Sequence, residues 1–183
     1  MKKIEKNPKL MAILAILTAT SIVAGKYLGI DAGEYMRFSL ENMPIIFAGL
    51  AFGPIPGAIV GISADLIGCA IKGWAPIPWV TVGAAMIGLV SGLMPILLKK
   101  AKLPLPLLVA VTVASTHIIG SLLIKSIGLS AFYGTPYHTI LLWRVTNYIV
   151  VGLADGATLY TLLKNKEIKK RISAIKGDQN DLR

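Results

Sequence analysis

The residues able to do chemistry in this sequence are charged side chains that stand inside long apolar stretches. Asp65, Arg144 and Asp155 are the clearest examples, because their neighbours in the sequence are uncharged. A charge in apolar surroundings is costly unless it is paired or hydrated. Arg144 and Asp155 are eleven positions apart, which on one helix gives a shared face but a separation of about 16 Å. They cannot pair directly, so each needs another partner.

Arg144 has the side chain best suited to an anionic ligand. Its guanidinium presents a planar fork of donors that matches a carboxylate or a phosphate. Asn147 follows one helical turn later and offers both a donor and an acceptor. Arg144 could equally form an ion pair with an acid such as Glu34, or extend its side chain to the membrane interface. For Asp65 and Asp155 we expect helix capping or hydrogen bonds between helices.

Motifs for catalysis and nucleotide binding are missing. The sequence contains no GxxxxGK[ST], HExxH or GxSxG. His117 and His138 have no metal-like spacing to each other or to acids, so each is expected to be hydrogen-bonded or interfacial. Cys69 is the only cysteine, which rules out a disulfide within the chain and a cysteine-based metal site. We therefore predict neither an enzyme nor an ATPase, and neither a cofactor nor a metal.

Composition predicts the elements that position these residues. Hydrophobic residues make up 55% of the 183 residues, charged residues only 15%, and the mean hydropathy is +0.69. Several uncharged stretches reach the roughly 20 residues that a helix needs to cross about 30 Å of hydrocarbon. There are five uncharged stretches in all, over 10–25, 42–64, 73–98, 103–124 and 126–143. The first also fits a secretory signal peptide, but a retained span explains the same residues.

Positive charges predict the topology. The net charge of +10 comes from Lys and Arg at the ends of the apolar stretches, which indicates membrane topology rather than nucleic-acid binding. Basic residues cluster before residue 10, at 99–102 and after 163, and the positive-inside rule places all three clusters in the cytoplasm. This requires the stretch 42–64 to turn at Gly53-Pro54-Ile55-Pro56-Gly57.

We therefore predict an all-α integral membrane protein with six transmembrane helices and both termini in the cytoplasm. The helices are placed near 9–28, 43–53, 56–71, 78–99, 104–125 and 138–164. The second, about 16 Å long, is too short to cross alone and needs shelter from the others. Residues 1–165 form one membrane domain, and 166–183 form a basic, polar tail. The expected location is the cell membrane, as a multi-pass protein.

This topology leaves three loops on the outer side, at 29–42, 72–77 and 126–137. They carry Arg37 in the first loop, Lys72 and Trp74 in the second, and Tyr133 in the third. No separate soluble domain is expected, so these loops and the outer halves of the helices are the candidates for an external binding site. The long first loop is the expected lid.

Small residues recur at helical spacing in two places. Gly49, Gly53, Gly57 and Gly61 stand four apart, as do Gly88 and Gly92, and the first helix carries an AxxxA at Ala15 and Ala19. Small residues allow helices to approach closely. We expect packing within the chain at the glycines, and we expect the alanines to lie on an exposed face of the first helix that can dock a partner.

Three sequence elements resemble a known family. They are RFSLENMPI at 37–45, FGPIPGAIVGISADLIG at 52–68 and LWRVTNYIVV at 142–151. With the basic N-terminus and the AxxxA helix, they resemble the substrate-binding S component of energy-coupling factor (ECF) vitamin transporters, and most of all its folate-specific branch. The resemblance covers nearly the whole chain.

The resemblance implies a six-helix protein that captures a vitamin from the outer face with high affinity. It also implies docking on a transmembrane coupling subunit driven by two cytoplasmic ATPases, with Ala15 and Ala19 at the contact. Folate has a dianionic glutamate tail for cationic residues and a flat pterin for aromatic ones, although Trp and Tyr are also common at membrane interfaces. The candidate substrate-binding residues are Arg37, Lys72, Trp74, Trp79, Tyr133, Arg144, Asn147 and Tyr148.

Two alternatives stay open. One is an S component for another compound, such as pantothenate, a queuosine precursor or a thiamine-related pyrimidine. The other is a solitary ion-coupled secondary transporter, in which Asp65 or Asp155 would be the ion site. An intramembrane enzyme is disfavoured, because no nucleophile and base or metal triad can be assembled from the sequence.

Overall fold

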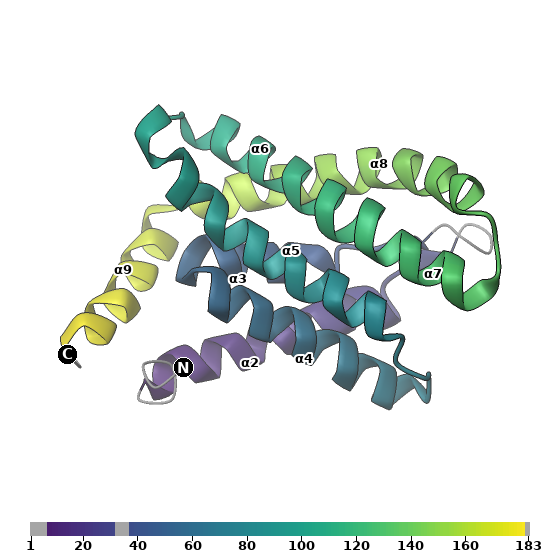
Figure 1. The fold of residues 1–183 in the computed structure, drawn as a ribbon. Coiled ribbons are helices and arrows are strands. Elements are labelled where there is room, and N and C mark those ends of the chain that lie inside the picture. Colours follow the sequence, from purple (N-terminus) through teal and green to yellow (C-terminus); the bar gives the residue numbers. More distant parts are fainter. Residues whose placement is uncertain (1–6, 32–36, 182–183) are drawn as a thin grey trace.

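The computed structural model describes residues 7–31 and 37–181, and these residues form a bundle of helices with one small hairpin (Figure 1). The first half of the chain holds α2 (Pro8–Ile22) with the π-helix η1 (Val23–Tyr27), α3 (Asn42–Phe52), α4 (Pro54–Lys72) and α5 (Pro78–Leu97). The second half holds the 3₁₀-helix η2 (Leu98–Ala101), α6 (Leu105–Thr116), the π-helix η3 (His117–Lys125), α7 (Ser126–Tyr133), α8 (Tyr137–Lys164) and α9 (Lys166–Asp181). Strands β1 (Ile30–Asp31) and β2 (Arg37–Phe38) pair antiparallel.

Each predicted segment coincides with a helix, and the polar tail forms α9. Within the described residues, four helical stretches are long and apolar enough to cross a membrane, namely Pro8–Tyr27, Pro54–Lys72, Pro78–Ala101 and Leu105–Tyr133. The predicted multi-pass membrane protein is confirmed at this level. The short second segment is the 11-residue α3. Six crossings and cytoplasmic termini stay predictions, as does the division into one domain and a tail.

Proline and glycine set the helix ends. Gly53 separates α3 from α4 with φ 104°, and Pro54 opens α4, where a proline loses no helical hydrogen bond. Gly73 and Gly134 end α4 and α7 in the left-handed region, with φ 68° and 66°, which suits a residue without a Cβ. The turn predicted at 53–57 is therefore confirmed as a sharp break at Gly53 alone.

The predicted outer loop at 126–137 is wrong over most of its length. The helix that starts at Leu105 continues without a break through Lys125 to Tyr133. Lys125 does not mark the end of an apolar span, because its side chain is buried and ion-paired inside the bundle. The chain turns only at Gly134, just before Pro136.

Close packing of α3, α4 and α5 depends on the glycines. A Cβ at Gly57 would lie 2.5 Å from the carbonyl oxygen of Gly88, and one at Gly49 would lie 2.7 Å from the same oxygen. A Cβ at Gly92 would collide with the backbone of Pro54. These contacts are between backbones, so no side chain can move aside. The predicted packing role is confirmed for Gly49, Gly57, Gly61, Gly88 and Gly92, but not for Gly53, where an added Cβ would meet nothing within 4 Å.

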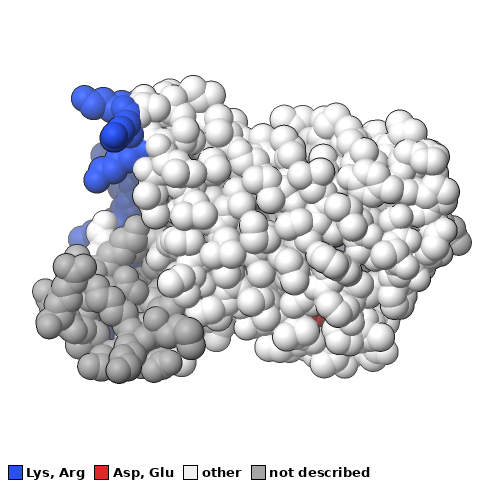
Figure 2. Space-filling view, viewed as in Figure 1, with Lys and Arg blue, Asp and Glu red and all other residues white. Residues whose placement is uncertain are grey.

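The two ends of the bundle differ in character. The start of α2, the end of α8 and all of α9 lie at one end, and the turns at 73–77 and 134–136 lie at the other (Figure 1). On the face shown in Figure 2, the Lys and Arg side chains gather near the junction of η2 and α6, and the rest of the described surface is almost uncharged. Large apolar side chains such as Ile16, Leu142 and Leu153 are exposed, as a bilayer requires.

Candidate ligand-binding site

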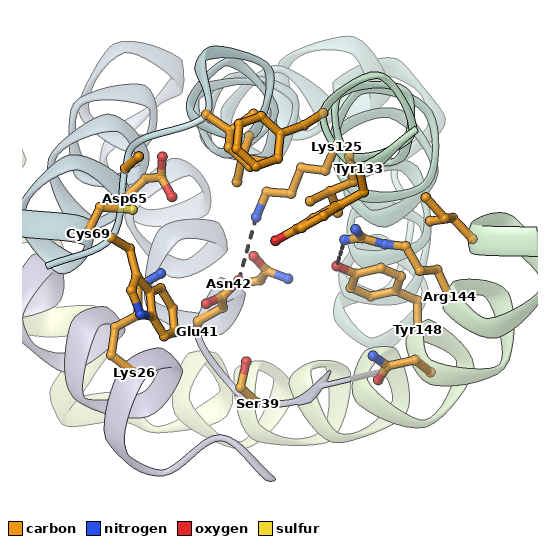
Figure 3. Close-up of a pocket in the computed structure, with 18 of the residues that line it drawn as sticks. Lys26, Ser39, Glu41, Asn42, Asp65, Cys69, Lys125, Tyr133, Arg144 and Tyr148 are labelled. Atoms are coloured by element: carbon orange, nitrogen blue, oxygen red, sulfur yellow. Dashed lines mark hydrogen bonds and ion pairs between the residues drawn. The ribbon is translucent and has the colours of Figure 1, made fainter. Parts of the chain in front are cut away.

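A cavity of about 630 Å³ lies among η1, α3, α4, η3, α7 and α8, beside the turn after α4 (Figure 3). This volume is in the range of small-molecule sites. Its lining mixes three kinds of group: cations, acids and amides, and aromatic rings. The cations are Lys26, Lys125 and Arg144, the acids and amides are Glu41, Asp65, Asn42 and Asn147, and the rings are Trp74, Phe132, Tyr133 and Tyr148.

Two of the three cations of the lining lie in π-helical turns. Lys26 belongs to η1 and Lys125 is the last residue of η3. A π-helix closes i→i+5 hydrogen bonds, and π-helical turns are frequent at functional sites. In Figure 3 both side chains are drawn within the lining of the cavity. Local helix geometry, rather than a loop, therefore places these charges.

Lys125 and Glu41 form an ion pair across the cavity. The Lys125 Nζ lies 3.6 Å from the Glu41 Oε1, and Lys125 is only 5% exposed. Glu41 comes just before α3, and its carbonyl oxygen accepts a hydrogen bond of 2.6 Å from the Ser21 hydroxyl of α2. The pair thus joins the end of the first loop to the far end of η3.

Arg144 reaches the cavity from α8. One guanidinium nitrogen, Nη2, donates to the Tyr148 hydroxyl at 2.7 Å, while Nε is buried and has no hydrogen-bond partner among the described residues. Within that part of the chain no carboxylate pairs with Arg144, which is 8% exposed. Glu34, the acid considered as its partner, lies outside the described residues. A buried guanidinium without a counterion is suited to bind an anion.

Aromatic rings line opposite parts of the same cavity. Trp74 lies in the turn after α4, and the Lys26 Nζ is 5.0 Å from the centre of its ring. Tyr133 ends α7 and packs edge-to-face against Phe132, with 5.2 Å between ring centres. Its hydroxyl points toward the middle of the cavity (Figure 3). Flat rings of this kind can stack on a heterocycle.

Acidic side chains deeper in the bundle are hydrogen-bonded between helices. The Thr81 hydroxyl of α5 donates to Asp65 of α4 at 2.6 Å. His117 of η3 donates from Nε2 to Asp155 of α8, 3.1 Å away. The interhelical hydrogen bonds expected for Asp65 and Asp155, and the hydrogen-bonded state expected for His117, are confirmed.

Comparison with known proteins identifies the family of the chain. A sequence profile of the family described as "ECF-type riboflavin transporter, S component" matches residues 5–169. The chain belongs to this family. The chain is accordingly an S component, a vitamin-uptake subunit that binds a vitamin and works with an ECF coupling module, and the prediction from the sequence elements is confirmed at that level. No curated protein sequence matches significantly.

Solved structures agree on the fold. A crystal structure of FolT bound with folic acid matches with a TM-score of 0.68 at 18% identity, covering 84% of this chain and 90% of that chain. A crystal structure of the S component for biotin from an ECF-type ABC transporter matches with a TM-score of 0.63 at 21% identity, covering 86% and 92%. At these identities the likeness shows the S-component fold and leaves the vitamin open.

Five of the eight candidate substrate-binding residues line the cavity of the S component. These are Trp74, Tyr133, Arg144, Asn147 and Tyr148. They come from different elements, and α8 supplies the last three at positions i, i+3 and i+4, which is one helix face.

Two of the other three candidates, Lys72 and Trp79, do not line the cavity, and the structure does not test the third, Arg37. Lys72 holds its Nζ 4.2 Å from the centre of the Tyr27 ring. Trp79 is 54% exposed and packs on α7 at Gly128. Arg37 is in β2, but its side chain lies outside what the structure describes.

Sequence reasoning missed Lys26, Glu41, Asn42 and Lys125 as cavity residues of the S component. One signal was available for Lys125, because it is the only charged residue between positions 103 and 143. A lone lysine in 41 otherwise uncharged positions is better explained by a function than by a boundary.

Proposed function

We propose that this S component captures folate from the outer face of the cell membrane. The observation that carries the proposal is Arg144, a buried guanidinium that lines the cavity and pairs with no carboxylate among the described residues. Such a group favours a ligand with a carboxylate. Folate ends in a glutamate with two.

The remaining lining supports the same ligand. Trp74, Tyr133 and Tyr148 offer rings on which a flat pterin can stack. Asn42 and Asn147 offer donors and acceptors for the edge of a heterocycle, and the Asn42 Oδ1 is buried without a partner in the described structure. Lys125 adds a second cation once it leaves Glu41. Biotin also carries a carboxylate but has no aromatic ring to use these stacking surfaces.

Riboflavin is the second candidate, because the matching family is named for it. Its isoalloxazine ring suits the same aromatic side chains, but the vitamin has no carboxylate. A riboflavin site would therefore leave Arg144 without an ionic partner. The two candidates therefore differ in whether Arg144 forms an ion pair with the bound vitamin, and not only in affinity.

The direct test is a binding panel. The purified protein in lipid nanodiscs is titrated with folate, riboflavin and biotin in separate calorimetry runs, and the compounds that co-purify are identified by mass spectrometry. Folate is expected to bind below about 1 µM, equivalent to roughly 8 kcal/mol. Tight binding of riboflavin, with folate inactive, would replace the proposal by the second candidate.

We further propose that the S component docks on a transmembrane coupling subunit, driven by two cytoplasmic ATPase subunits, through Ala15 and Ala19. Both alanines are exposed on α2, next to the exposed side chains of Met11 and Ile16. A face with two small residues four positions apart allows another helix to approach closely. In this arrangement both termini are cytoplasmic and the cavity faces outward.

A further inference from the structure

We propose that His117 and Asp155 are positioning residues that hold the Arg144 guanidinium in place through Tyr148. This inference rests on the proposed binding of an anionic vitamin at Arg144. Neither His117 nor Asp155 lines the ligand cavity, so neither is offered as a ligand contact. They would act on the ligand only through the side chain of Tyr148.

An unbroken series of contacts joins the four side chains. The Arg144 Nη2 donates to the Tyr148 hydroxyl at 2.7 Å. The Tyr148 ring is stacked on the His117 ring, with 5.0 Å between centres and 29° between planes. His117 in turn donates to Asp155 at 3.1 Å. The series links Arg144 to Asp155, which are too far apart on α8 to touch.

The burial of His117 and Asp155 costs stability, so the presence of this pair needs an explanation. His117 is 4% exposed and Asp155 is fully buried, and the second oxygen of Asp155, Oδ1, has no partner among the described residues. A carboxylate in that position costs stability, so its presence points to a purpose that apolar residues cannot serve. Orienting one imidazole ring is such a purpose, because an acceptor at Nε2 fixes both the tautomer and the plane of the ring.

The Tyr148 side chain borders two open spaces in the protein. One side of Tyr148 lines the ligand cavity, and it also lines a second, almost wholly apolar groove between α6, η3 and α8. The imidazole also lies beside Gly152, where an added Cβ would make an ordinary contact at 3.4 Å from the His117 Cδ2. The stacked His117 ring and the hydrogen bond from Arg144 both hold the Tyr148 ring between these spaces.

A purely architectural role is the competing hypothesis, in which His117 and Asp155 only join η3 to α8. The two roles differ in what they do to ligands. Loss of an architectural bond weakens every ligand of the cavity alike. Loss of positioning weakens only the part of the affinity that comes from Arg144, and it has no effect once Arg144 is gone.

The test is a double-mutant cycle with two ligands. His117→Gln keeps an amide that can bond Asp155 but removes the stacked ring. We expect its Kd for folate to rise about tenfold, with no further rise in the Arg144→Ala background. Affinity for pterin, which lacks the glutamate, is expected to stay the same. Asp155→Leu removes the acceptor that orients the ring and should weaken folate binding in the same way, whereas Asp155→Asn keeps an acceptor oxygen for the His117 Nε2 and should retain most of the folate affinity.

His138→Gln is the matched control, because His138 is the other histidine of the chain and is exposed at the start of α8. Equal weakening of folate and pterin by His117→Gln, or an undiminished effect in the Arg144→Ala background, would overturn the inference. If the wild-type protein binds no folate, the proposed function fails separately. The cycle is then measured on the unfolding temperature of the ligand-free protein, where strictly additive losses for His117→Gln and Arg144→Ala would overturn the inference.

Discussion

The Lys125 ammonium lies 3.6 Å from the Glu41 carboxylate, across the cavity of the S component. The two residues come from the ends of different elements, Glu41 just before α3 and Lys125 at the end of η3. An anionic ligand therefore meets a lysine that already has a counterion. The carboxylate of the ligand has to compete with Glu41 for Lys125, so breaking the ion pair is part of the free-energy cost of binding.

Substitutions at the two residues are expected to act in opposite directions. Glu41→Gln removes the competing charge and should lower the Kd for folate by about threefold or more, because like charges in a site repel. Lys125→Met removes the cation and leaves the Glu41 charge facing the ligand. Its Kd should rise by about tenfold or more, since a hydrogen bond to a charged group contributes about 1.5–3 kcal/mol.

Calorimetric titration of both variants in nanodiscs measures this difference. Glu167→Gln, an exposed acid of α9 far from the cavity lining, is the matched control and should leave the Kd unchanged. Weaker folate binding in both variants would contradict competition and would make the ion pair a structural element of the site.

Arg144→Ala is expected to weaken folate binding by at least tenfold, on the order of 1.4 kcal/mol, because the ligand loses its guanidinium partner. Arg171→Ala removes an exposed arginine of α9 and serves as the control. If Arg144 instead pairs with Glu34, then Glu34→Gln should change stability and ligand affinity together. Tight folate binding that ignores Arg144→Ala would remove this residue from the site.

Bulky residues at the alanine pair should separate binding from transport. Ala15→Phe with Ala19→Phe blocks close approach on α2, so we expect vitamin uptake by cells that express the full transporter to be lost. The purified variant should keep its folate Kd, because neither alanine lines the cavity. Ala154→Phe, on an exposed position of α8, is the control. Normal uptake by the double variant would leave the alanines without a docking role.

Glycine substitutions should affect stability according to the space around each Cα. Gly88→Ala places a Cβ against the backbone of Gly57, and overpacking of this kind costs about 1–3 kcal/mol. Gly156→Ala is the matched control in α8, where nothing lies within 4 Å of the added Cβ. It should be neutral or stabilising by about 0.5–1 kcal/mol. Unfolding in mixed micelles measures both, and equal effects would contradict the packing of α4 on α5.

Features that depend on local sequence were predictable. Gly53 and Pro54 mark the break between α3 and α4, and the lengths of the apolar stretches predict the helices. Arg144, Asn147 and Tyr148 share a helix face by spacing alone, so their joint entry into one cavity follows from α-helical geometry. The resemblance of three sequence elements then identified the family.

Features that depend on contacts between distant segments were not predictable. His117 and Asp155 are 38 positions apart, and nothing local pairs an imidazole of one helix with a carboxylate of another. Lys125 was interpreted as a boundary because a charge usually ends an apolar span. Its partner, Glu41, lies on another element and neutralises it inside the bundle. Trp79 and Lys72 have side chains suited to contact a ligand, but their positions on α5 and α4 place them outside the cavity lining.

The wide turns of η1 and η3 make the positive charge of this cavity sensitive to the gain or loss of a residue. A π-helical turn accommodates an extra residue in an otherwise α-helical run, and each residue of a helix rotates the following side chains by about 100°. Deleting one residue between His117 and Lys125 would remove the widened turn that precedes the ammonium, while leaving the lysine in the sequence. The positive charge of this site is therefore encoded partly in the length of the chain, so that an insertion or a deletion can change it without any substitution.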